Sequence, residues 1–247
     1  MKRFFMVLIA VASLVTTGGC ITSGHLDGLG DMYTAASITD SQLKELSRQM
    51  RAEGDAQNEV ADANSKYAKR LARLTDRFRK EDGLDLNFKV YMSKTVNANA
   101  TADGSIRVYS ALMDMMTDNE LLFIIGHEIG HVKDGDSLDK IRMAYASSGA
   151  IKAASASSAG GNLVLGRSDL QGLLHKVLNA QFSQKQESDA DAYGYRLMRK
   201  YKFDTKAAVA ALEKLNRLGA SGGVMASHPN SGSRASAIQA MIDRDGK

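Results

Sequence analysis

The chain has 247 residues, of which 44% are hydrophobic and 24% charged, which suits a protein with a buried core and excludes a disordered one. A single Pro, 22 Gly and 6% aromatic residues exclude collagen-like and Pro-rich architectures and favour a mainly helical protein. The net charge is +4, and basic residues are interleaved with acidic ones, so no nucleic-acid partner is expected.

Residues 1–19 are expected to form a signal peptide. Lys2 and Arg3 precede an apolar run from Phe4 to Val15, and small residues follow it. The run is too short for a transmembrane helix, which needs about 20 apolar residues. The only cysteine, Cys20, comes directly after the small residues.

The position of Cys20 resembles the lipobox of bacterial lipoproteins. The resemblance implies a lipid anchor on Cys20 and, because Ile21 rather than Asp follows, an outer-membrane protein whose domain faces the periplasm. Thr17 replaces the usual Leu, and an ordinary cleaved signal that leaves a free thiol is the alternative. Residues 20–38 are expected to form a flexible lead-in, and residues 39–247 a single domain.

The first half of this domain is expected to contain two helices and then two strands. Thr39 or Asp40 can cap a helix to about Ala52, and apolar residues spaced three and four apart predict another over 61–80. Alternating residues predict a half-buried strand over 86–92, and a tight turn at Asp103-Gly104 precedes a second strand over 105–110. We expect these strands to form a small antiparallel sheet.

The second half is expected to be helical. Thr117 and Glu120 have capping-box spacing and open an apolar helix that runs into His127. The small-residue segment 145–161 is predicted to form closely packed helices or a mobile flap. Further helices are predicted over 169–182, 184–201, 205–218 and 231–244. The fold class expected is therefore α+β and mainly helical.

The segment from His127 to His131 has the sequence H-E-x-x-H. Two histidines four residues apart on a helix share one face and can bind a zinc ion, with Glu128 beside them as general base. The alternative is a pair of histidines that only cap an amphipathic helix. It is disfavoured because burying this pair is costly unless a metal compensates. One Zn²⁺ per chain is the expected cofactor.

A catalytic zinc site needs a third protein ligand. The metzincin pattern is excluded, because Ser137 stands where its third histidine belongs. Glu187 can serve instead, and Asp191, one helical turn later, can accept a hydrogen bond from a ligating imidazole. This spacing is typical of a gluzincin zinc metalloprotease, although Glu187 and Asp191 could also be solvated helix charges.

Several short segments also occur in the order seen in a known peptidase family. They are Asn97-Ala98, Asp103 to Val108, Asp118 to Leu121, His127 to His131, Glu187 to Asp191, and Ser227-His228-Pro229. In these segments the chain resembles the family that includes HtpX, the CAAX prenyl endopeptidases and Oma-type proteases, over about Ala63 to Ile238. It departs at Asn99, where an aromatic residue is usual, and at Asp136, where a histidine is common.

The resemblance implies hydrolysis by direct attack of water. Zinc acidifies the water and polarises the scissile carbonyl, while Glu128 takes the proton and returns it to the leaving amine. His228 is expected to stabilise the oxyanion, and Arg234 to bind substrate or position the loop; surface positions without function are the alternatives. Asn97 and Ala98 are expected on an edge strand to which an extended peptide adds.

The leading hypothesis is an endopeptidase that acts on unfolded or misassembled envelope proteins. The main alternative is a chaperone-like or binding module of the outer membrane that hydrolyses little, and hydrolysis of a non-peptide amide is a third. Glu128 favours the enzyme, because a binding module needs no general base between its metal ligands.

Overall fold

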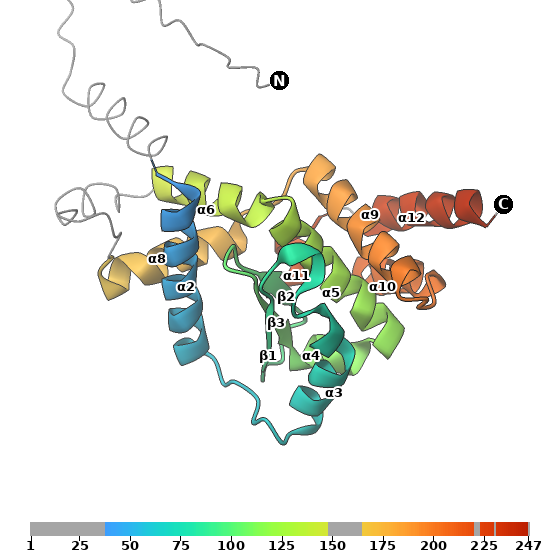
Figure 1. The fold of residues 1–247 in the computed structure, drawn as a ribbon, viewed down its shortest axis with the longest axis horizontal. Coiled ribbons are helices and arrows are strands. Elements are labelled where there is room, and N and C mark those ends of the chain that lie inside the picture. Colours follow the sequence, from blue (N-terminus) through green and yellow to red (C-terminus); the bar gives the residue numbers. More distant parts are fainter. Residues whose placement is uncertain (1–37, 148–164, 220–222, 230, 247) are drawn as a thin grey trace, which may run out of the picture.

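The computed structural model describes residues 38–147, 165–219, 223–229 and 231–246. The predicted signal peptide, Cys20 and nearly all of the small-residue segment 145–161 lie outside these residues. The described helices surround a small central sheet (Figure 1). They are α2 Asp40–Gln57, α3 Lys66–Thr75, α4 Ser110–Met115, α5 Asp118–Lys133, α6 Asp136–Ala146, α8 Arg167–Asn179, α9 Gln184–Lys200, α10 Lys206–Arg217, α11 Val224–Ser227 and α12 Ser231–Asp245.

The sheet has three strands, β1 (Asn87–Tyr91), β2 (Ala98–Ala100) and β3 (Ser105–Tyr109), in the order β1-β3-β2. β2 and β3 pair antiparallel, whereas β1 and β3 are parallel. The expectation that the two predicted strands pair antiparallel is therefore wrong for β1 and β3. The chain first crosses from β1 to the far edge, forms β2 there, and returns through the turn at Gly104 to place β3 in the middle.

Local capping decides where several helices begin. α5 starts as predicted, because the Thr117 backbone N–H donates to Glu120 Oε2 at 2.7 Å in a capping box. α3 is shorter than predicted and starts only after Ser65, whose hydroxyl accepts a hydrogen bond from the Ala68 backbone N–H. α4, α6 and α11 lie outside the helices predicted from the sequence.

The two faces of the sheet differ in polarity. Apolar side chains such as Val90, Ile106 and Val108 lie in the main core, which α3, α5, α9, α10 and α12 complete. On the other face, Arg107 bonds Asp55 of α2 through two nitrogens, at 2.8 and 3.1 Å. Burial raises the pKa of Asp55, but hydrogen bonds from Arg107, Lys89 and Tyr91 outweigh it and hold that pKa well below its usual range.

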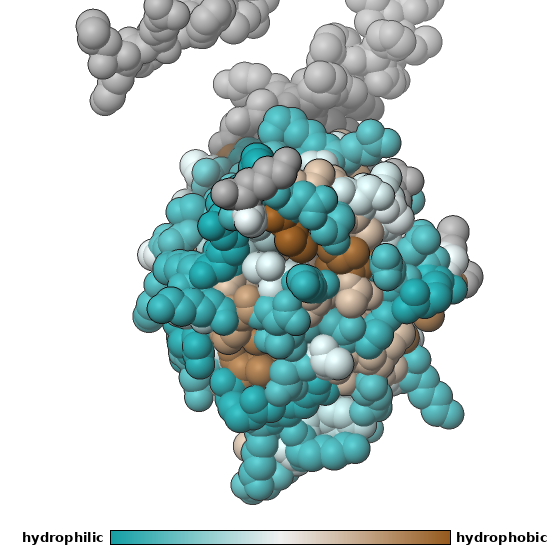
Figure 2. Space-filling model, turned by 90° about the vertical axis from the view of Figure 1, so that its right-hand side faces the viewer, coloured by the Kyte–Doolittle hydropathy of each residue, from teal (hydrophilic) through white to brown (hydrophobic). Residues whose placement is uncertain are grey.

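A second apolar cluster joins α2, α6 and α8 on the polar side of the sheet, and includes Leu43, Leu46, Ile141 and Leu173. Figure 1 shows these three helices together, on the opposite side of the sheet from α5, α9, α10 and α12. None of the helices in the described ranges is long and apolar enough to cross a membrane. The face in Figure 2 is mostly hydrophilic, with smaller apolar patches.

The close contact between α5 and α9 depends on three glycines, Gly126, Gly130 and Gly194. A Cβ atom on Gly126 would lie 2.9 Å from the Cα atom of Gly194, too close for any real contact. This approach brings the first turn of α9 next to the H-E-x-x-H segment of α5.

Replacing Gly126 with Ala should therefore destabilise the fold by about 1–3 kcal/mol through overpacking, although Ala favours helices. The matched control is Gly172→Ala in α8, where nothing lies within 4 Å of the new Cβ atom. That variant should be stabilised by about 0.5–1 kcal/mol. Urea unfolding measures the free energy of unfolding of both variants. An equal change of that free energy in the same direction would contradict the role assigned to the helix contact.

Candidate metal centre

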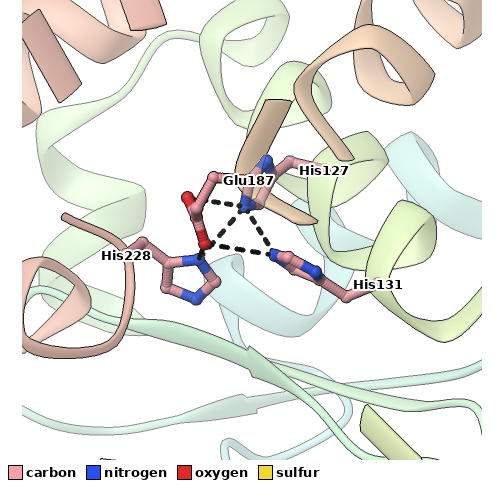
Figure 3. A group of neighbouring side chains, drawn as sticks. All are labelled: His127, His131, Glu187 and His228. Atoms are coloured by element: carbon pink, nitrogen blue, oxygen red, sulfur yellow. Dashed lines mark hydrogen bonds and ion pairs between the residues drawn. The ribbon is translucent and has the colours of Figure 1, made fainter. Parts of the chain in front are cut away.

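Four side chains converge between α5, α9 and the segment after α11 (Figure 3). They are His127 and His131 of α5, Glu187 of α9, and His228, which follows α11. Each offers one donor atom, and all four atoms lie within 4.8 Å of one another. All four side chains are buried, so the cluster is shielded from solvent.

The two histidines of α5 have their tautomers set by carboxylates. His127 Nδ1 lies 2.9 Å from Asp191 Oδ1, and His131 Nδ1 lies 2.8 Å from Asp136 Oδ2. Because a carboxylate accepts hydrogen bonds, each Nδ1 carries the proton and each Nε2 presents a lone pair. The two Nε2 atoms are only 3.1 Å apart, and His131 Nε2 is 3.5 Å from Glu187 Oε1. Such unprotonated donors around one point fit a divalent cation.

The pKa shifts of the clustered side chains are consistent with a site for a divalent cation. Burial would raise the pKa of Glu187, but His228, His131 and His127 lower it far below its usual range. Burial, helped by Arg234, lowers the pKa of His127. Burial also acts to lower the pKa of His131, but hydrogen bonds to Asp136 and Glu187 raise it overall.

Arg234 of α12 holds the two carboxylates of α9 in place. Its Nε and Nη2 atoms each donate to Asp191 at 2.7 Å, and its Nη1 forms an ion pair with Glu187. The sequence analysis expected Arg234 to bind substrate or to position the loop. The structure places its buried guanidinium against Asp191 and Glu187, where it fixes their orientation.

Replacing Asp191 with Asn should lower metal affinity or activity by about 10–100-fold, because Asn keeps the size but loses the charge that orients His127. Competition with a zinc-binding dye measures the affinity. The matched control is Asp189→Asn, a half-exposed residue of the same helix that pairs with Lys185. Equal affinities for the Asp191→Asn variant and the unmodified protein would remove Asp191 from this role.

Glu128 lies beside the cluster and is the residue best placed to carry a proton. Its side chain is buried, and its Oε1 has no hydrogen-bond partner among the described residues. Burial raises the pKa of Glu128, and the neighbouring Glu187 adds to that rise. A raised pKa brings a carboxylate closer to the range in which it can both accept and return a proton.

His228 lies closer to the metal ligands than the sequence analysis expected. Its Nδ1 is 2.8 Å from Glu187 Oε1 and 3.1 Å from His127 Nε2, so it is a fourth possible donor. Its Nε2 lies 3.5 Å from Glu128 Oε1. Burial lowers the pKa of His228 to about 4, which leaves the ring neutral at neutral pH.

Two contacts of His131 were missed by sequence reasoning. Asp136, noted only as a departure from the family pattern, begins α6 immediately after Gly135, whose φ is 83°. Phe182 stacks on the His131 ring with centroids 3.7 Å apart and an interplanar angle of 8°. Only the position of Asp136 five residues after His131 gave a local signal, because Phe182 reaches the ring through the packing of another segment.

The predicted edge strand lies beside Glu128. Asn97 and Asn99 line the same narrow cleft as Glu128 and His228. Asn97 Oδ1 and Asn99 Nδ2 are buried and lack hydrogen-bond partners within the described part of the chain. Ala98 pairs with Val108 of β3, as part of the strand that forms this edge of the sheet.

Comparison with known proteins agrees with this geometry. Residues 64–242 match peptidase family M48. The chain is 40% identical to metalloprotease LoiP of Escherichia coli (strain K12) over 250 residues, covering 99% of this chain and 98% of LoiP. It is 38% identical to metalloprotease YcaL of the same organism over 252 residues, covering 98% of each chain. The chain therefore belongs to peptidase family M48 and is a metallopeptidase with a buried His-His-Glu metal site.

Proposed function

We propose that this metallopeptidase is a zinc-dependent endopeptidase that hydrolyses peptide bonds of unfolded or misassembled envelope proteins. One observation carries the proposal. The donor atoms of His127, His131 and Glu187 converge, and beside them lies Glu128, whose Oε1 has no hydrogen-bond partner among the described residues. This arrangement supplies both a metal site and a proton acceptor, which together suffice to hydrolyse an amide.

The residues of the chain perform the proton transfers. His127, His131 and Glu187 would hold a zinc ion, which would supply a Lewis acid to polarise the carbonyl and acidify water. Glu128 Oε1 accepts the proton of the attacking water, and the same oxygen then donates it to the leaving amine. Because Glu128 is buried and has a raised pKa, the proton is held between these two steps.

The edge strand β2 offers a place for the peptide backbone. β2 lies at the edge of the sheet and pairs with β3 alone among the described strands; its residue Asn99 and the preceding Asn97 line the cleft beside Glu128. An extended peptide can add to this edge by backbone hydrogen bonds. Asn97 Oδ1 is then an acceptor and Asn99 Nδ2 a donor for peptide groups, which would satisfy two buried polar atoms.

We expect the His228 ring to occupy two positions, one among the metal donors and one beside them. A catalytic zinc site keeps one position open, whereas His228 lies 2.8 Å from Glu187 among the donors. The cleft it lines has a free volume of only about 20 Å³. We therefore expect the ring to leave the donor cluster when substrate enters and to stabilise the developing oxyanion from beside it.

Purified zinc-loaded protein incubated with an unfolded protein tests the proposed function. We expect fragments that disappear when a chelator is added and return when zinc is restored. The Glu128→Gln protein, with its metal site intact, is the matched inactive control. The narrow cleft is the observation that favours the chaperone-like alternative, and binding without fragments would support that alternative.

We also propose that the chain is anchored to the outer membrane by lipid on Cys20, which lies outside the described residues. Cys20→Ala should give a soluble periplasmic or unprocessed product without an acyl label. Ser23→Ala, a small substitution in the same segment, is the control and should keep the label. Fractionation and metabolic acyl labelling check this, and unchanged labelling of Cys20→Ala would contradict the lipid anchor.

A further inference from the structure

Lys140 of α6 lies between the catalytic cleft and a second, larger cavity. It lines the cleft together with Glu128 and His228. It also lines a cavity of about 590 Å³ between α6 and α8, which lies outside the metal centre. Lys140 therefore stands at the point where a peptide leaving the cleft would pass toward the α6–α8 cavity.

The ammonium group of Lys140 has an aromatic contact but no close anion. Its Nζ lies 3.8 Å from the centroid of the Phe182 ring, which also stacks on His131. Within the described part of the chain, no carboxylate forms an ion pair with this nitrogen. Glu128, Glu187 and Asp136 act on it only through longer-range attraction.

These contacts leave the positive charge of the Lys140 ammonium group without a directly bonded anion. Burial lowers the pKa of Lys140 to about 8, against the attraction of the three carboxylates. A contact with an aromatic face is weaker than a hydrogen-bonded ion pair, so Phe182 does not replace an anionic partner. Lys140 is half-buried, and a partly desolvated cation without such a partner is less favourable than one whose partner a ligand supplies.

The α6–α8 cavity is lined by positive charge, the same sign as the ammonium group of Lys140. Its described lining includes the cations Lys140 and Lys176 and contains no acidic residue. Met143 also lines it and is 72% exposed, which gives an apolar surface next to the positive charges. A cavity lined by one sign of charge favours a ligand of the opposite sign.

We propose that Lys140 is a specificity-determining residue that binds a carboxylate of the peptide substrate, either on an acidic side chain near the scissile bond or at the C-terminus. The inference rests on the proposed endopeptidase function and names the substrate class of that site. The carboxylate pairs with the ammonium of Lys140, which lines both the cleft and the α6–α8 cavity, in place of the contact with Phe182 alone.

Matched peptides test this proposal. Each pair differs only in Glu or Gln at one position, scanned across the scissile bond, and each peptide is made with a free and an amidated C-terminus. Binding is measured by fluorescence anisotropy with the Glu128→Gln protein, and kcat/KM with the active protein. We expect a preference of about 10-fold, equivalent to about 1.4 kcal/mol, for the carboxylate at one position or at the terminus.

Variants assign the preference to the ammonium. Lys140→Gln should bind the two peptides of the selective pair equally, and Lys140→Arg should retain the preference because it keeps the charge. Lys133→Gln is the control for net charge, because Lys133 is an exposed residue at the end of α5 whose Nζ lies near the Asp82 carbonyl. Lys133→Gln should keep the preference.

The outcomes separate this inference from the proposed function. A binding preference that Lys140→Gln abolishes supports the inference, even if the active protein cleaves no peptide. The absence of cleavage would contradict the proposed endopeptidase function instead. Cleavage without any carboxylate preference would overturn the inference and leave the endopeptidase standing. A preference that persists in Lys140→Gln would also overturn it.

Discussion

The Glu128→Gln protein should lose proteolysis by about 10²–10⁴-fold and keep its metal, because general acid–base catalysis contributes about that factor. Gln is nearly isosteric with Glu, and the side chain is buried, with its Oε1 lacking a hydrogen-bond partner among the described residues. The variant should therefore fold, bind zinc through His127, His131 and Glu187, and lack only the proton acceptor.

Steady-state cleavage of an unfolded protein and metal analysis by mass spectrometry check both halves of this prediction. Glu213→Gln, at an exposed residue of α10, is the control for a change of one charge. It should leave the cleavage rate and the metal content unchanged. Normal turnover by Glu128→Gln would remove Glu128 from the proton transfers. Loss of metal from the same variant would show that Glu128 supports the metal site rather than the chemistry.

The Glu187→Ala protein should lose both metal affinity and activity. Glu187 is the one carboxylate in the cluster of four donors, so its replacement removes the only negatively charged donor of that cluster. The loss of affinity should exceed the about 10–100-fold expected for a residue that only orients a ligand, such as Asp191. Arg234 would also lose one of its two buried partners, so some loss of stability is expected.

A zinc titration against a competing dye, together with thermal unfolding with and without zinc, measures these effects. Asp189→Ala removes a carboxylate two residues away on the exposed side of α9 and is the matched control. The control should bind zinc normally. If Glu187→Ala retained full zinc occupancy after dialysis against a weak chelator, Glu187 could not be a ligand.

The sequence predicts best those parts of the site that are set within one helix. His127, Glu128 and His131 lie on one turn of α5, and the capping box before them fixes where that helix begins. Glu187 and Asp191 are one turn apart on α9, which is why their different contacts, to the metal site and to His127 Nδ1, could be anticipated.

Contacts between segments far apart in sequence could not be predicted in the same way. Arg234 reaches Asp191 only because α12 packs against α9, and His228 reaches Glu187 across 41 residues. The parallel pairing of β1 with β3 likewise depends on where β2 is placed, which residue alternation does not encode. These contacts are determined by tertiary packing rather than by local patterns.

Anomalous diffraction at the zinc absorption edge, from crystals of the Glu128→Gln protein grown with zinc, tests the central claim most directly. We predict a single strong peak bounded by His127 Nε2, His131 Nε2 and the carboxylate of Glu187. The same map shows whether His228 Nδ1 also contacts the metal. No peak at this position, or a metal held elsewhere by other residues, would contradict the account.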